Sequence, residues 1–336
     1  MSFALIKKIS FNSKFDFMSL RRLSLMFSGL LVLGSLAAFF TVGLNYGVDF
    51  RGGSLLEVRM KQSFQMDELR AELNDLDLGE IRLQEFGQPK DVLILVQFQV
   101  ADSADEEENA QQVAIEKIKA QLQDRVDQYR RTEVVGPTVS SELIEAGILA
   151  TLLALGAIAL YIAIRFEWRF ALAALVALTH DVITTIGLFA ILQLEFNLAT
   201  VAAILTIAGY SINDTVVVFD RIRESLRKYK KMTVYDLLNL ALNATLTRTT
   251  MTSITTLLAL LSLFIFGGPV IRDFSIALIW GVIIGTYSSL LLATPLVLIL
   301  GLKATVFDKP EIDDEDGAAA YVKRMKGKRG TDDSEE

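Results

Sequence analysis

Six apolar stretches alternate with charged segments along the chain. A membrane-spanning helix needs about 20 mostly apolar residues, because the hydrocarbon core of a bilayer is about 30 Å thick. The pattern predicts six spans, at Leu23–Leu44, Leu143–Ile164, Phe170–Leu192, Phe196–Phe219, Thr249–Phe266 and Phe274–Leu300. The first follows a basic lead, residues 1–22, but its apolar run is too long for a typical signal peptide, so we expect an uncleaved anchor. The chain is thus predicted to be a polytopic α-helical membrane protein.

The connection between the first two spans, residues 45–140, alternates between strand-like and helical periodicity. Strands are expected at Ser54–Met60, Glu80–Phe86, Val92–Val100 and Thr132–Val135, with helices at Met66–Leu76 and Ala104–Tyr129. The order βαββαβ predicts an α+β domain of the ferredoxin-like type. Its acidic residues have no nearby histidine or serine in a catalytic pattern. We therefore expect a binding or coupling module and no enzyme.

Lysine and arginine are unevenly divided among the short connections. Residues 165–169 carry two and residues 220–236 carry six, whereas residues 193–197 carry none and residues 267–273 carry one. Loops rich in these residues stay on the cytoplasmic side. Both termini and the loop 220–248 are therefore expected in the cytoplasm of a bacterium. Residues 45–140 then form a periplasmic domain, and residues 141–302 carry spans two to six in the inner membrane.

Composition excludes several classes of site. The net charge of −7 gives no electrostatic support for a nucleic-acid partner. Cysteine is absent and His180 is the only histidine, so thiolate and histidine-cluster metal sites are excluded. No G-x-x-x-x-G-K-[ST] phosphate-binding loop occurs. We expect neither a cofactor nor a metal.

Charged residues inside the predicted spans are the main functional candidates, since a charge at the centre of a span costs about 2.5–3.5 kcal/mol. Asp214 lies in span four beside Ser211, Asn213 and Thr215. Ser211, Asp214 and Thr215 share one helical face. Asp214 is a candidate proton carrier. The alternative is a carboxylate that reaches the basic membrane edge or caps a helix.

Three further residues belong to this set. Arg248 opens span five, followed by Thr252 on one face, and either pairs with a carboxylate or anchors the helix at the cytoplasmic edge. His180 and Asp181 lie near the middle of span three. Because adjacent residues point about 100° apart on a helix, they are not expected to face the same neighbour. Asp181 is expected to face the bundle, as a relay carboxylate or a structural acceptor, and His180 to be a packing residue or a proton carrier.

Two cytoplasmic segments have their own patterns. Residues 232–245 follow a basic run and carry an apolar stripe, which predicts an amphipathic helix along the inner membrane surface. The stripe comprises Val234, Leu237, Leu238, Ala241 and Leu242. The tail, residues 303–336, alternates acidic and basic blocks with little apolar content, which predicts disorder.

Five short sequence strings lie, in order along the chain, within or next to the predicted spans. Residues 47–53 (GVDFRGG) follow span one, where glycines by themselves indicate only a tight turn. The others are residues 135–143 (VGPTVSSEL), 179–182 (THDV), 208–221 (AGYSINDTVVVFDR) and 245–253 (TLTRTTMTS). Together they resemble the motifs of the SecD/SecF protein-export family, in its SecF branch. Ser140 stands where that family usually has a glycine.

The resemblance implies a resistance-nodulation-division type core, of which this chain supplies one six-span half. It implies a SecD-type six-span partner, contact with the Sec translocon channel subunits and with exported polypeptides, and use of the proton gradient late in export. It places Asp49, Phe50, Gly52 and Gly53 in a signature loop and Arg248 in a proton relay. Two alternatives stay open: a half-transporter for small hydrophobic solutes or lipids, and a purely structural assembly factor.

Orientation can be tested with a single cysteine at position 105 (Asp105→Cys), because the chain has no cysteine of its own. We expect a membrane-impermeant thiol reagent to label it from the periplasmic side. A Lys230→Cys control should be labelled only from the cytoplasmic side. Labelling of position 105 solely from the cytoplasmic side would overturn the predicted topology.

Overall fold

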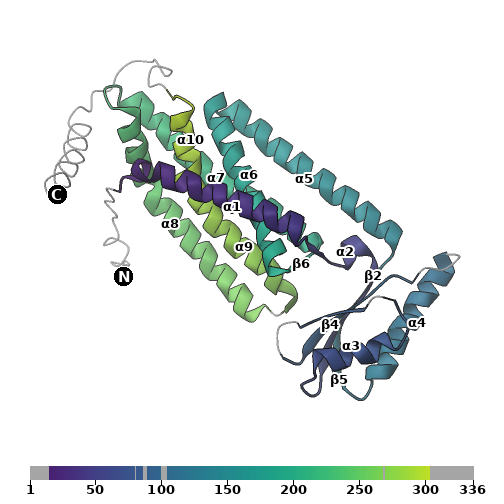
Figure 1. The fold of residues 1–336 in the computed structure, drawn as a ribbon. Coiled ribbons are helices and arrows are strands. Elements are labelled where there is room, and N and C mark those ends of the chain that lie inside the picture. Colours follow the sequence, from purple (N-terminus) through teal and green to yellow (C-terminus); the bar gives the residue numbers. More distant parts are fainter. Residues whose placement is uncertain (1–14, 80, 86–88, 100–103, 268, 303–336) are drawn as a thin grey trace, which may run out of the picture.

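The structure, a computed structural model, describes residues 15–79, 81–85, 89–99, 104–267 and 269–302. It consists of a bundle of long helices with an α/β domain at one end of the bundle (Figure 1). Most of the basic lead and the whole charged tail, residues 303–336, lie outside the described residues.

Six helical segments are long and apolar enough to cross a membrane, which confirms the six predicted spans. The first joins the 3-10 turn η2 (Phe17–Leu20) to α1 (Arg21–Thr41). The next four are α5 (Pro137–Arg165), α6 (Trp168–Leu192), α7 (Leu198–Lys228) and α8 (Val234–Phe266). The last comprises α9 (Pro269–Ser288), the π-helical turn η3 (Ser289–Ala293) and α10 (Thr294–Ile299).

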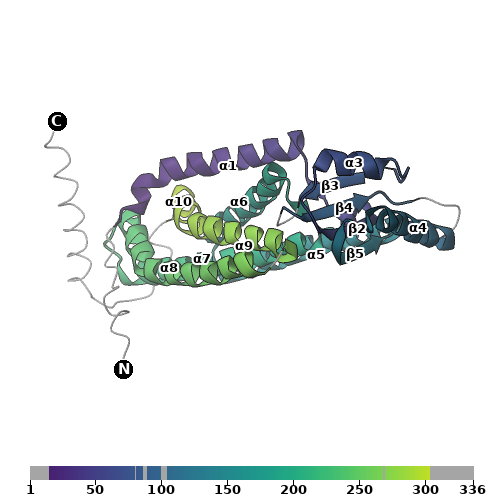
Figure 2. The same ribbon diagram turned by 90° about the horizontal axis from the view of Figure 1, so that it is seen from below.

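The central helices of the bundle are α6, α7 and the segment from α9 to α10. About half of the residues in their most apolar stretches are buried. In the corresponding stretch of α5 the buried share is 6%, and in those of α1 and α8 it is 17%. Figure 2 shows α1 and α8 along opposite sides of the bundle. The outer helices therefore present apolar faces that suit lipid or a protein partner.

One sequence interpretation is wrong. The stripe predicted to lie on the membrane surface belongs to α8, which runs without interruption from Val234 to Phe266. Leu237, Leu238, Ala241 and Leu242 are completely buried and pack in the same cluster as side chains of α6 and α7. Periodicity reveals an apolar face, but here protein covers that face instead of lipid.

The α/β domain has the predicted order of elements. They are β2 (Gly53–Met60), α3 (Met66–Asn74), β3 (Ile81–Glu85), β4 (Asp91–Val96), α4 (Ala104–Leu122) and β5 (Val126–Val135). The strands form a sheet in the order β3-β4-β2-β5, with every neighbouring pair antiparallel. Apolar residues of α3 and α4 pack with Leu56, Val58 and Met60 on one face of this sheet.

Several boundaries in this domain differ from the predicted ones; the last strand, for example, begins at Val126 and not at Thr132. The second helix ends at Leu122 and not at Tyr129, because Val126 and Tyr129 pair with Met60 and Val58 in the sheet. The third strand ends at Val96, while residue 100 lies outside the described part. Pairing with β2 therefore overrides the local helical periodicity of residues 126–129. Strand β4 ends at Val96 because Val96 pairs with Ser54 and Ile81, which lie at the starts of β2 and β3.

A buried ionic cluster joins three strands of this sheet. Asp91 is completely buried and receives two hydrogen bonds from Arg59, at 2.7 and 2.8 Å. Arg130 of β5 reaches both Asp91 and the buried Glu57 of β2. A buried carboxylate is tolerated only when paired in this way, so the cluster helps define the register of β2, β4 and β5.

Close packing of α1 on α6 depends on Gly187. A Cβ atom at this position would lie 2.2 Å from the Cβ of Ser35. Gly187→Ala should therefore push α1 away and lower the stability by about 1–3 kcal/mol, the usual range for overpacking. Gly209→Ala is the control, because its Cβ would meet nothing within 4 Å. Thermal unfolding, followed by tryptophan fluorescence, should show a lower midpoint for Gly187→Ala alone, and equal midpoints would contradict this account.

Candidate functional site

A buried carboxylate joins the three central helices. Asp181 of α6 is completely buried, and its Oδ2 accepts hydrogen bonds from Ser211 of α7 at 2.6 Å and Ser288 of α9 at 2.7 Å. Its Oδ1 lies 2.9 Å from Nδ1 of His180. Asp181 faces the bundle as expected, and these contacts position α6, α7 and α9 relative to one another.

His180 contacts the adjacent carboxylate, because its Nδ1 lies 2.9 Å from Oδ1 of Asp181. Apart from this contact the two side chains meet different residues, as expected from their positions on the helix. The imidazole ring lies 6.2 Å from the ring of Tyr287, centroid to centroid. Tyr287 donates to the carbonyl of Ser24 and shares a hydrogen bond with Ser28 of α1. His180 and Tyr287 thus lie between Asp181 and α1, but Nε2 of His180 has no hydrogen-bond partner among the described residues.

Asp214 lies on α7, about one turn beyond Ser211, and its side chain is also buried, with 3% exposure. Its Oδ2 has no hydrogen-bond partner among the described residues. The polar companions expected for it are directed elsewhere: Ser211 binds Asp181, and Thr215 shares a hydrogen bond of 2.8 Å with Ser289. Asn213 is exposed at the surface of the bundle. Asp214 is therefore a buried carboxyl group whose Oδ2 is unsatisfied.

Arg248 lies on α8, which packs against α7. Its side chain is exposed and forms no ion pair with Asp214 in the described part of the chain, although the two charges interact through space. Thr252 donates to the carbonyl of Thr249 in its own helix. The structure thus brings Asp214 and Arg248 onto neighbouring helices without joining them, and a small helix displacement would change their separation.

Ser288 and Ser289 were missed by the sequence interpretation. They precede and begin the π-helical turn η3, and Ser289 donates to the carbonyl of Gly285 and hydrogen-bonds Thr215. Such turns are frequent at functional sites because they interrupt the regular helical hydrogen bonds. The available signal was the polar run of residues 286–289 within an otherwise apolar span.

The signature loop connects the α/β domain to the bundle. It folds as the helical turn α2 (Val48–Arg51), in which Asp49 Oδ2 accepts a hydrogen bond of 2.9 Å from the backbone N–H of Leu198. Leu198 is the first residue of α7, where unpaired N–H groups favour an anion. Phe50 packs against the rings of Tyr46 and Phe196. The loop therefore holds the end of the helix that carries Asp214.

Steric constraints favour glycine at both positions 52 and 53 of the signature loop. Gly52 and Gly53 have φ angles of +71° and +120°, which side chains rarely adopt. A Cβ on Gly53 would also lie 2.3 Å from the carbonyl oxygen of Val96 in β4. The pair lets the chain turn from α2 directly into the central strand β2.

Further contacts complete this junction. Strand β1 (Asn45–Tyr46) pairs in parallel with β6 (Glu195–Phe196), which immediately precedes α7. The backbone N–H of Glu195 donates to Asp273 of α9. Ser140, the residue that departs from the family pattern, donates to the Val48 carbonyl at 3.4 Å. The signature loop and β6 therefore connect the α/β domain to α5, α7 and α9.

Glu195 is the titratable side chain at the centre of the junction. Burial raises the pKa of its carboxyl group, and the charge of Arg131 on β5 partly offsets that effect. Its Oε1 would lie 2.5 Å from a Cβ on Gly47, so the signature loop packs directly on this side chain. Among the described residues, no group of three His, Cys, Asp or Glu side chains is arranged to hold a metal ion.

Two family profiles match this chain. The profile of "Protein export membrane protein SecD/SecF, C-terminal" matches residues 114–303, and that of the "SecD/SecF GG Motif" matches residues 37–63. The chain belongs to the SecD/SecF protein-export family. The two glycines of the family motif are Gly52 and Gly53, and the C-terminal match covers Asp181, Asp214 and Arg248.

SecD/SecF family members from bacteria cover most of the chain. Protein translocase subunit SecF of Rickettsia bellii is 45% identical over 86% of this chain and 94% of its own length. The subunit of the same name from Cereibacter sphaeroides is 47% identical over 82% of this chain and 86% of its own.

A solved structure of the SecD/SecF family has the same fold. The crystal structure of SecDF from Thermus thermophilus, described as a translocon-associated membrane protein, superposes with a TM-score of 0.78 at 34% identity. The match covers 87% of this chain and 39% of SecDF. SecDF in its super-membrane-facing form gives a TM-score of 0.58 at 30% identity. This chain therefore spans about two fifths of the SecDF chain.

Asp49→Ala tests the role of the signature loop at the start of α7. Loss of a carboxylate that accepts a backbone N–H at a helix N-terminus should cost about 1–2 kcal/mol of local stability. Hydrogen exchange at the Leu198 amide should accelerate accordingly. Asp67→Ala removes an exposed carboxylate on α3 that pairs with Arg70, and it should leave that amide unchanged. Equal exchange in both variants would exclude a capping role for Asp49.

Proposed function

We propose that the chain is a subunit of the bacterial Sec protein-export apparatus that acts with a SecD-type six-span partner. It would use the proton gradient to promote late steps of polypeptide translocation across the inner membrane. The observation that carries the proposal is the buried, unsatisfied carboxyl group of Asp214 on the helix that the family signature loop holds. Family membership and the similarity to SecF subunits support the export role. They do not favour a half-transporter of small hydrophobic solutes or lipids.

We infer that the α/β domain is a periplasmic, ferredoxin-like domain and that both termini are cytoplasmic. Support for the fold comes from the βαββαβ order and from the antiparallel sheet β3-β4-β2-β5. In this sheet β2 and β4, the first and third strands of the domain, are the central neighbours. Support for the orientation comes from the lysine and arginine residues concentrated at the end of the bundle that carries Arg165 and Arg227. No cofactor enters the proposal.

The energy source is the movement of charge across the membrane. One elementary charge moving through 100 mV releases about 2.3 kcal/mol, which biases an equilibrium more than tenfold. Harvesting it requires a group that is charged in one state and neutral in another. Asp214 meets this requirement, whereas Arg248 remains charged and would attract or release the carboxylate as α7 and α8 shift.

Asp181 would serve the relay differently. Its two oxygens already contact Ser211, Ser288 and His180, so this carboxylate is held in one geometry. It would fix the positions of the helices around Asp214 and could share a proton through His180. Movement of α7 would reach the α/β domain through Asp49, because Asp49 is bonded to the first residue of that helix.

A second six-span protein would complete the site. Asn213 and Arg248 are exposed at the surface of the isolated chain, although both belong to candidate membrane spans. Polar groups at this depth are stable only against protein or water. A SecD-type partner covering this surface would supply that lining. Translocon channel subunits and exported polypeptides are the further partners we propose.

Asp214→Asn tests the relay, because it keeps the size of the side chain and removes its titration. Folding should survive, and gradient-dependent export should fall to the level measured with an uncoupler. Asp220→Asn is the control on the same helix, since Asp220 lies six residues beyond Asp214 in an exposed pair with Arg165. Export should be measured in vesicles containing the chain, its SecD-type partner and the translocon.

Arg248→Met in the same assay separates charge from packing, because methionine keeps most of the bulk of the side chain. Loss of gradient-dependent export in Asp214→Asn and Arg248→Met, but not in Asp220→Asn, would support the relay. Wild-type export by Asp214→Asn, with and without uncoupler, would eliminate it and leave a structural role for Asp214.

A further inference from the structure

An apolar groove lies where the bundle meets the α/β domain. It has a volume of about 470 Å³ and is lined by α5, α6, α7 and the segment from Leu44 to Arg51. It follows α5 from Ile144 to Leu152, about 12 Å of helix at the usual rise of about 1.5 Å per residue. Its walls are almost entirely aliphatic and aromatic, and the relay described above does not use them.

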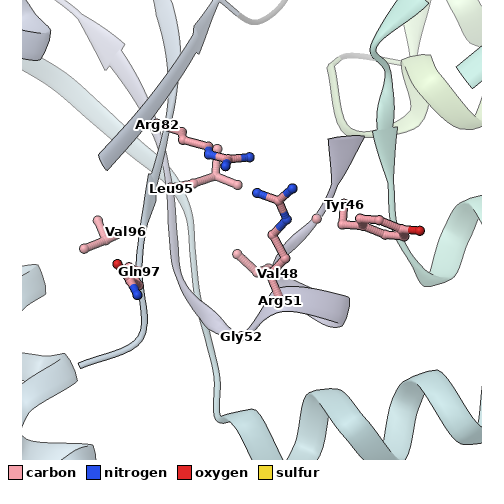
Figure 3. Close-up of a pocket in the computed structure, with 9 residues that line it drawn as sticks. Tyr46, Val48, Arg51, Gly52, Arg82, Leu95, Val96 and Gln97 are labelled. Atoms are coloured by element: carbon pink, nitrogen blue, oxygen red, sulfur yellow. The ribbon is translucent and has the colours of Figure 1, made fainter. Parts of the chain in front are cut away.

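Two arginines stand at one end of this groove. Arg51 of the signature loop lines the groove and also a neighbouring cavity of about 340 Å³, which Arg82 of β3 lines as well. Figure 3 shows the guanidinium groups of Arg51 and Arg82 directed toward the same space, while the ring of nearby Tyr46 points away from them. Both arginine side chains are exposed. The combined site is therefore apolar at one end and positively charged at the other.

We propose that this site binds an anionic phospholipid, with an acyl chain in the groove and the phosphate between Arg51 and Arg82. A guanidinium group presents several N–H donors to phosphate oxygens, and two such groups facing one space favour an anion between them. The groove lies at the end of the candidate spans, where a lipid headgroup would meet the α/β domain. Tyr46 has the amphipathic character typical of that depth.

The exposure of α5 favours a lipid over a segment of exported polypeptide. Ile148 and Leu152 line the groove and are also more than half exposed, so the groove opens onto the lipid-facing side of the bundle. Lipid reaches this opening by lateral diffusion, whereas a polypeptide would have to leave water. A bound lipid would brace α5 against the signature loop, and it would affect the junction independently of Asp214.

Two glycines on α5 provide a matched pair for the test. Gly147 lines the groove, and neither it nor Gly156 would bring a Cβ within 4 Å of a neighbour. Gly147→Leu should therefore fill the groove without distorting the helix, while Gly156→Leu adds the same bulk elsewhere on α5. Arg51→Gln and Arg82→Gln remove the charges, with Arg70→Gln on α3 as their control.

Native mass spectrometry of the purified full chain would measure retained phosphatidylglycerol and phosphatidylethanolamine after reconstitution in vesicles of both lipids. We expect selective retention of phosphatidylglycerol, lost in Gly147→Leu and kept in Gly156→Leu. Each arginine variant should weaken retention about fivefold, the effect of about 1 kcal/mol per basic residue at an anionic surface. Equal retention in Gly147→Leu and Gly156→Leu, or no preference between the two lipids, would overturn the proposal.

A photoactivatable side chain at position 148 identifies the occupant in membranes with active export. A cross-linked mass equal to one phospholipid supports the proposal. A cross-link to a translocating polypeptide or to another membrane subunit contradicts it. Gradient-dependent export by the same variants is read separately, so failure of the lipid site leaves the relay of Asp214 and Arg248 untouched.

Discussion

The arrangement of the bundle depends on one buried carboxylate. Asp181 is surrounded by apolar helices, and burying an unpaired charge there would cost far more than the whole fold can offset. The serines at positions 211 and 288 satisfy it from two other helices, and His180 satisfies it from the same helix. Because hydrogen bonds require distances near 2.7 Å, this network restricts how α6, α7 and α9 can slide past one another.

This constraint gives two nearby carboxylates different properties. Both oxygens of Asp181 have hydrogen-bond partners, whereas Asp214 is also buried and has an oxygen without a partner among the described residues. A group that already has its hydrogen bonds has little reason to change state, but an unsatisfied one gains from a proton or from an approaching cation. In the proposed relay, the fixed network would provide the rigid surroundings in which protonation of Asp214 displaces α7 relative to α8.

The junction near Asp49 explains how such work would leave the membrane. The signature loop bonds to the start of α7, packs on Glu195, and continues through Gly52 and Gly53 into the central strand of the α/β domain. Helix α7 is 31 residues long and extends from this junction past Asp214. A helix is stiff along its axis, so in the proposed relay a displacement near Asp214 would be transmitted to the sheet. The proposed lipid site lies beside the same loop and would set how freely it moves.

The sequence alone determined the six spans and the βαββαβ order, because hydrophobic length and periodicity are local properties of the chain. It also identified Asp181, Asp214 and Arg248, since charged residues in apolar runs are conspicuous. Only the tertiary structure decided which side chains surround each of these residues. Ser211 was assigned to Asp214 by helical spacing but donates to Asp181. The stripe on α8 was assigned to the membrane surface but is buried within the protein, where α8 packs against α7 and α9. Periodicity shows which residues share a face, whereas the neighbour that covers that face depends on long-range packing of helices distant in sequence.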